Sequence, residues 1–84
     1  MKKEWLITFR TITYAQRAER ILQEGGIFAQ LHRTPKSLSQ RGCGYCLRLQ
    51  ERDIPIARQL LELQQLHYEK IYAGNERSWE EERM

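Results

Sequence analysis

The sequence predicts an α+β domain that contains one antiparallel sheet and two helices. Two kinds of pattern lead to this fold class. Short stretches in which apolar and polar residues alternate are typical of half-buried strands, and they occur four times. Two longer segments instead repeat their apolar residues at helical spacing. The chain has 84 residues, which is the size of one small domain.

The first strand and first helix follow from residues 4–24. Residues 4–10 alternate in polarity, with Trp5, Ile7 and Phe9 on one side. Thr13 followed three positions later by Gln16 is a capping-box pattern and predicts that a helix opens there. Gly25-Gly26 predicts a left-handed cap at the end of this helix.

The second and third strands are predicted on either side of a loop. Residues 27–32 form the second strand, residues 33–42 are rich in loop-forming Pro, Ser and Gly, and residues 45–50 form the third strand. Asp53 is expected to cap the second helix, with Pro55 in its first turn, where a missing N–H has no cost.

The last strand is predicted at residues 68–73, where Gly74-Asn75 stops it. We therefore expect one domain over residues 1–74. Residues 75–84 carry a run of three Glu residues and are expected to be a charged C-terminal tail, either mobile or a short helical extension.

The element order strand–helix–strand–strand–helix–strand predicts a ferredoxin-like βαββαβ sandwich. In this arrangement each right-handed half encloses a strand of the other half, which gives a four-stranded antiparallel sheet with both helices on one face. The other sheet face is expected to stay open. Trp5, Phe9, Phe28 or Tyr72 are candidates to lie on it and to make it a surface for a homodimer.

Charge and hydropathy narrow the class of protein. Residues 1–50 carry a net charge of +6 and residues 51–84 a net charge of −3, and the cysteines lie in the basic part. A basic surrounding favours a thiolate and attracts anions. No apolar run approaches the ~20 residues of a membrane span, and the N-terminal residues lack the apolar stretch of a signal peptide. These features predict a cytoplasmic protein without a membrane partner.

The only two cysteines, Cys43 and Cys46, form a Cys-Gly-Tyr-Cys motif that leads into the third strand. A thiolate is a nucleophile, a soft metal ligand and one half of a disulfide, so the pair concentrates the reactive chemistry of the chain. In the predicted topology the loop before the third strand lies where the first strand feeds the first helix. Cys43 is thus expected near the helix N-terminus, around residues 11–14, where a thiolate is stabilised.

Residues around this motif carry a family resemblance. The run from Thr34-Pro35 through Ser39 to Cys43-Gly44 is similar to the selenium/sulfur carrier protein-like family, which pairs such a loop with a Cys-Gly that opens a strand. The resemblance covers roughly residues 4–74. Carried over by position, it matches Cys43 to the family cysteine, Gly44 to the glycine after it, Pro35 to the loop proline and Ser39 to the loop serine.

The resemblance implies a small carrier that accepts sulfane sulfur or selenium on Cys43 and passes it to an acceptor. Its donor would be a protein such as a cysteine desulfurase or a selenocysteine lyase, and the sequence does not identify the acceptor. We expect no cofactor beyond the carried atom, and group carriage rather than enzymatic turnover. Gly42 and Gly44 would leave Cys43 accessible, and Arg41 is positioned in the sequence to lower its pKa.

Cys46 is a candidate resolving thiol, which would release a persulfide on Cys43 by forming a disulfide. In an extended strand, residues three apart point to opposite faces and lie about 10 Å apart. A disulfide needs Cα atoms within about 7 Å, so the bond forms only if Gly44 bends the chain. The alternative is that Cys46 is a small buried strand residue.

Other functions remain open from the sequence. A thioredoxin-like protein would place its CxxC at a helix N-terminus, whereas this motif enters a strand. One CxxC is half of a zinc site, which His32 and His67, or a second copy of the chain, would have to complete. Binding of single-stranded nucleic acid is disfavoured because the third strand has one aromatic residue and no RNP-type motif.

Overall fold

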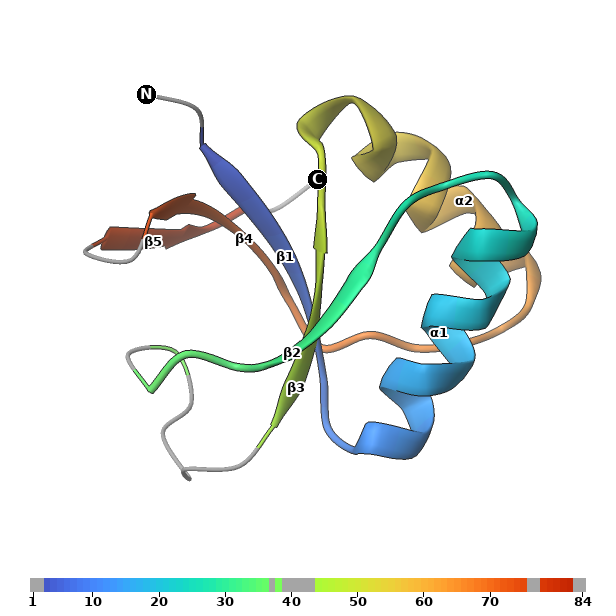
Figure 1. Ribbon diagram of the computed structural model, residues 1–84, viewed down its shortest axis with the longest axis horizontal. Helices are drawn as coiled ribbons and strands as arrows, with labels where there is room; N and C mark the ends of the chain where they lie inside the picture. Colours follow the sequence, from blue (N-terminus) through green and yellow to red (C-terminus); the bar gives the residue numbers. More distant parts are fainter. Residues whose placement is uncertain (1–2, 37, 39–43, 76–77, 83–84) are drawn as a thin grey trace.

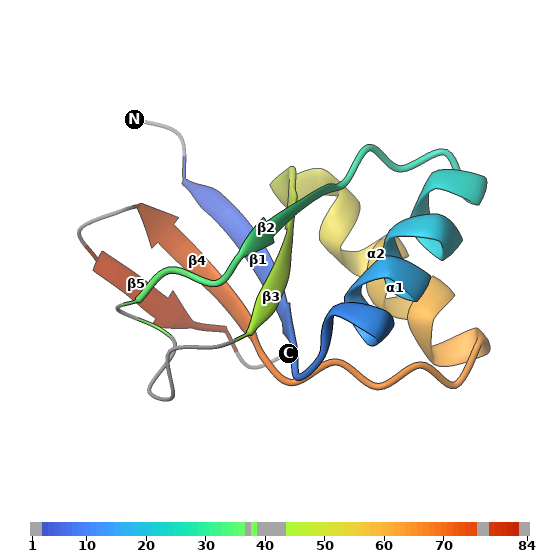
Figure 2. The same cartoon turned by 60° about the horizontal axis from the view of Figure 1, so that its bottom comes forward.

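The computed structural model describes residues 3–36, 38, 44–75 and 78–82. The elements in chain order are β1 (Glu4–Phe9), α1 (Ile12–Glu24), β2 (Gln30–Arg33), β3 (Tyr45–Leu49), a 3-10 turn η1 (Glu51–Asp53), α2 (Ile54–Leu63), β4 (Ile71–Asn75) and β5 (Ser78–Glu81). Both helices lie on one side of a twisted antiparallel sheet (Figures 1 and 2). The predicted α+β class is confirmed.

The sheet has five strands in the order β2-β3-β1-β4-β5, so the expectation of four strands was wrong. The additional strand, β5, lies in the segment that was expected to be a charged tail, and it pairs antiparallel with β4. Gly74 makes this pairing possible, because its φ of +153° suits glycine and a Cβ there would collide with the main chain of Ser78. The Gly-Asn pair thus begins a hairpin instead of ending the sheet.

Two strands begin later than their sequence pattern predicted. Ile27 and Ala29 are buried, but the ladder of β2 starts only at Gln30. Before β4, the Lys70 amide donates a hydrogen bond to the Thr8 hydroxyl at 3.1 Å. The same hydroxyl donates to the Lys70 carbonyl at 3.2 Å. This segment is therefore anchored to β1 by a buried threonine, and the regular strand follows it.

The helix ends show where local sequence signals held. The N-cap of α1 is Thr11, whose hydroxyl accepts from the Tyr14 amide, so the capping box at Thr13 was wrong by two residues. The left-handed cap is confirmed at Gly26, with φ of +83°. Asp53 is the N-cap residue of α2 and Pro55 lies in the first turn, both as expected. The Asp53 side chain makes no capping hydrogen bond, since this residue is also the last of the η1 turn and has a helical backbone.

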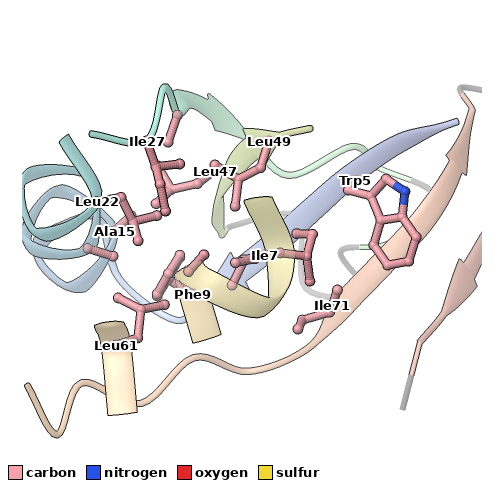
Figure 3. Close-up of a cluster of buried hydrophobic side chains, with 14 of the residues drawn as sticks. Trp5, Ile7, Phe9, Ala15, Leu22, Ile27, Leu47, Leu49, Leu61 and Ile71 are labelled. Atoms are coloured by element: carbon pink, nitrogen blue, oxygen red, sulfur yellow. The ribbon is translucent and has the colours of Figure 1, made fainter. Parts of the chain in front are cut away.

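The hydrophobic core lies between the sheet and the two helices. Figure 3 shows Ile7, Leu47 and Leu49 from the sheet facing side chains of α1 and α2 such as Leu22 and Leu61. Trp5 and Phe9 belong to this core, so the expectation that they lie on an open face was wrong. Side chains alternate along β1, so Trp5 and Phe9 lie on the same side of the strand as Ile7, and the helices cover that side.

The helix-free face of the sheet is closed at its centre. Leu6, Thr8 and Cys46 alternate with the core residues and are only 1%, 6% and 1% exposed. Tyr72 lies opposite Leu6 on this face, whereas Phe28, 73% exposed, lies in the α1–β2 connection outside the sheet. The described chain that leaves β2 runs on this same side, away from the helices (Figures 1 and 2). The prediction of an open face was therefore wrong for its central strands.

Candidate functional site: the entry into strand β3

Gly44 sets the geometry at the start of β3. Its φ is +152°, a conformation that other L-residues rarely adopt. Its carbonyl accepts a hydrogen bond from the Thr34 amide at 3.1 Å, which extends the β2–β3 pairing by one step. A Cβ on Gly44 would lie 3.3 Å from the Thr34 hydroxyl. The glycine thus lets the chain turn into the strand while its backbone approaches Thr34 closely.

Thr34 and Gly44 also mark the ends of the connection between β2 and β3. Pro35 follows Thr34 directly, and its carbonyl accepts from the Leu38 amide at 2.9 Å, which closes a turn. Cys43, Ser39 and Arg41 lie outside the described residues. Gly44, to which Cys43 is covalently joined, is therefore the nearest described point to the predicted nucleophile.

This end of the sheet is also where α1 begins. Tyr45 pairs with Phe9, the last residue of β1, and a Cβ on Gly44 would lie 3.9 Å from the Phe9 carbonyl. Helix α1 starts three residues later, capped by Thr11 (Figure 1). The sequence expectation that the loop before β3 comes to the end of β1 holds for Gly44. That Cys43 itself lies near the helix N-terminus stays a prediction.

Cys46 is a buried thiol on the helix-free face. It is 1% exposed, and its Sγ lies 3.8 Å from the Arg33 carbonyl, which it can meet as a weak donor. Burial raises the pKa of the Cys46 thiol to about 11, against smaller lowering effects of the Arg48 charge and the Thr34 hydroxyl. At neutral pH this thiol is protonated, which makes it a poor nucleophile in this conformation.

Polar groups surround the Cys46 thiol. His32 faces Cys46 across the β2–β3 ladder, is exposed, and its Nε2 lies 3.3 Å from the Gln30 side-chain oxygen. Arg48 lies two residues along β3 and pairs with Glu4 at 3.4 Å. The Thr34 hydroxyl is buried beside the thiol and lowers its pKa. Cys46 therefore lies among polar side chains and not in the hydrocarbon core.

Sequence reasoning did not assign a role to Thr34. Its place before Pro35 made it part of the loop pattern that carries the family resemblance. In the structure it also contacts Gly44 and lies beside Cys46. The structure thus brings together Gly44, Thr34, Pro35 and Cys46. The signal that could have identified Thr34 is the register of β2 and β3, because pairing Arg33 with Tyr45 brings Thr34 opposite Gly44.

The described residues do not gather ligands for a metal. Residues 3–36, 38, 44–75 and 78–82 contain no group of three or more His, Cys, Asp or Glu side chains placed to hold an ion. His32 belongs to β2, and His67 lies in the connection between α2 and β4. Among the described residues, neither helix is long and apolar enough to span a membrane.

These features define a small α+β protein with a Cys-Gly at the entrance to a central strand. The family model described as "Putative Se/S carrier protein-like" matches residues 4–73 of the chain, so the protein belongs to this family. The match includes the loop, both cysteines, the first three strands and the first part of β4. No curated protein sequence and no solved structure gave a match.

Proposed function

We propose that the protein is a cytoplasmic sulfur or selenium carrier that holds the transferred atom on Cys43. The observation that carries this proposal is the family match over residues 4–73, which includes the Cys-Gly step. The geometry of Gly44 supports it, because this residue, which follows Cys43 in the chain, has a glycine-specific backbone and lies at the end of the sheet where α1 begins. A protein donor such as a cysteine desulfurase or a selenocysteine lyase would supply the atom.

The proposed transfer is a thiol exchange in which the Cys43 thiolate attacks the terminal sulfur of a donor persulfide. A new S–S bond forms at Cys43 while the donor S–S bond breaks, and the donor cysteine leaves as a thiolate. An acceptor thiolate then attacks the same terminal sulfur and releases the Cys43 thiolate. The oxidation state of the carried sulfur passes along unchanged, so no external oxidant is needed. Selenium would follow the same steps.

Cys46 has a different place in this proposal. Its buried, protonated thiol is not available to attack a persulfide while β3 is intact. We therefore propose that loading depends on Cys43 alone. Resolution by Cys46 would require local opening at the start of β3. The Cys46 thiolate would then attack the Cys43 sulfur of the persulfide, the persulfide S–S bond would break, and the terminal sulfur would leave as hydrosulfide while the disulfide forms.

We also propose that the first four strands and the two helices are a ferredoxin-like core. The order β2-β3-β1-β4 and the antiparallel pairing of neighbours support this. Strand β5 would then be an addition at the β4 edge. In this arrangement Gly44 lies at the start of β3, beside the central pair β1–β3.

Loading can be tested by mass spectrometry of the intact protein. The wild type, Cys43→Ser and Cys46→Ser would each be incubated with a cysteine desulfurase, its cofactor and cysteine. We expect a gain of one sulfur atom, removed by reductant, on the wild type and Cys46→Ser but not on Cys43→Ser. A parallel incubation with a selenocysteine lyase and selenocysteine tests selenium. Equal loading of Cys43→Ser, or absence of any adduct on the wild type with either donor, would contradict the proposal.

The contribution of Gly44 can be separated from general backbone strain. We expect Gly44→Ala to lower the rate of loading at least about tenfold, because the new Cβ strains the backbone and presses on Thr34. Gly26→Ala is the matched control, since Gly26 also has a positive φ but meets no neighbour within 4 Å and lies at the end of α1. If Gly44→Ala and Gly26→Ala are both folded and load at comparable rates, the backbone of Gly44 is not needed for loading.

A further inference from the structure

The outer edge of β2 is the free edge of the sheet closest to the candidate site. Strand β2 lies at the end of the strand order and pairs only with β3 within the described part of the chain. Hydrogen-bonded and outward-facing residues alternate along an antiparallel edge strand. Since Thr34 bonds to Gly44, Leu31 directs its peptide groups outward and Arg33 directs its amide outward, while the Arg33 carbonyl lies 3.8 Å from the Cys46 Sγ.

The charge along this edge has one sign. Described residues 30–36 contain Arg33 and Lys36, both exposed, together with His32, and they contain no carboxylate. The opposite edge of the sheet, β5, carries exposed Glu80 and Glu81. Among the described residues, the two edge strands therefore differ in the sign of their charged side chains, and Glu81 of β5 also pairs with Lys70 at 3.3 Å. Short, charged edge strands resist non-specific pairing. A partner must therefore carry the opposite charge as well as offer an extended segment that can pair with the strand.

The position of the edge relates it to the Cys-Gly step. Thr34 ends the β2 ladder and bonds to Gly44, the residue after Cys43. A strand added beside β2 would lie about 4.8 Å from it and about 10 Å from β3. Its end would then reach the place where the chain turns toward the cysteine loop. Strand β5, in contrast, lies three strands away from β3, across β1 and β4.

The geometry points to β2 as the docking edge for an acidic, extended segment of the sulfur or selenium donor protein, which pairs with Leu31 and Arg33 as an additional strand. This inference rests on the proposed carrier function and names how its donor is recognised. Main-chain pairing supplies affinity in such complexes, and charge complementarity supplies selectivity and association rate. The order of events is docking at β2 first, followed by transfer to Cys43.

The test uses the full chain and a sulfur-loaded cysteine desulfurase, with transfer followed by mass spectrometry over a range of desulfurase concentrations. Arg33→Pro removes an outward N–H and a charge while it leaves the β2–β3 ladder intact, as edge strands allow. Arg33→Glu reverses the charge alone. We expect both variants to raise KM at least about tenfold with little change in kcat, and Arg33→Glu to do so most at low salt.

The matched controls are Glu81→Pro and Glu80→Lys on the β5 edge, which should leave KM unchanged. Hydrogen exchange gives an independent readout: the amides of Leu31 and Arg33 should be protected when the desulfurase is added, and those of β5 should not. Circular dichroism and a thermal melt confirm that each variant is folded.

Three results would overturn the inference. If Arg33→Pro and Arg33→Glu load with the KM of the wild type, donor docking at β2 is wrong while the carrier function stands. If the wild type takes up no sulfur at any donor concentration, the carrier function itself fails. If the chain alone self-associates in sedimentation experiments, and Arg33→Glu abolishes this, the occupant of the edge is β5 of a second copy and not the donor.

Discussion

The two faces of the sheet bury their central residues to a similar degree but with different chemistry. The helix-covered face is lined by hydrocarbon side chains such as Ile7, Phe9 and Leu47, which pack against α1 and α2 (Figure 3). The helix-free face buries Leu6 beside a threonine and the Cys46 thiol, near the Arg48–Glu4 ion pair. One face therefore serves packing alone, and the other combines packing with groups that respond to pH.

The largest expected effects come from leucines on the two faces. Leu47→Ala and Leu6→Ala each remove a side chain that is at most 1% exposed, so each should lower the free energy of unfolding by about 2–5 kcal/mol. Urea unfolding of both variants measures this. If Leu6→Ala costs less than about 1 kcal/mol while Leu47→Ala costs several, the helix-free face is not packed in solution and the comparison breaks.

The thiol on the helix-free face should make stability depend on alkaline pH. Burial raises the pKa of Cys46 in the folded protein to about 11, above the ordinary 9.0. The protonated thiol therefore stabilises the fold fully below pH 9, and this contribution is lost as the pH rises from 9 through 11. The loss should be on the order of 2 kcal/mol.

This pH dependence is measured as urea unfolding between pH 8 and about 11.5 in a Cys43→Ser background, which removes the other thiol. Cys46→Ala in the same background is the control, because every other titrating group remains. We expect the two stability curves to differ in slope between pH 9 and 11. Parallel curves would show that the Cys46 thiol is hydrated and that the helix-free face opens readily.

The fold was predictable where the signal is local. Alternation along residues 4–10 placed Trp5, Ile7 and Phe9 together correctly, because a strand has a fixed period of two. Which side of the sheet the helices cover depends on pairing between distant strands, so the sequence alone misplaced Trp5 and Phe9. Strand β5 was missed because an exposed edge strand needs no apolar alternation, and its Glu-rich sequence resembles a solvated tail.

The candidate site was predictable in chemistry more than in geometry. The spacing of Cys43 and Cys46 indicated that their side chains point to opposite faces of an extended strand, which left Gly44 as the residue that could bend the chain. The structure gives Gly44 a backbone conformation suited to glycine. The burial of Cys46 was one of the two alternatives that the sequence left open, and the structure bears it out. The sequence could not decide between them, since burial depends on what covers the helix-free face.

The smallest expected effect concerns the charge beside the thiol. Arg48→Met breaks a partly exposed ion pair with Glu4, so it should change stability at neutral pH by less than about 1 kcal/mol. Arg48 also lowers the pKa of Cys46, and its removal should therefore raise that pKa further. In the same pH series, the alkaline loss of stability should extend to higher pH than in the parent protein.

Glu4→Gln is the matched control, because it breaks the same ion pair but keeps the Arg48 charge near the thiol. An equal upward shift in both variants would mean that the ion pair, and not the Arg48 charge, sets the environment of Cys46.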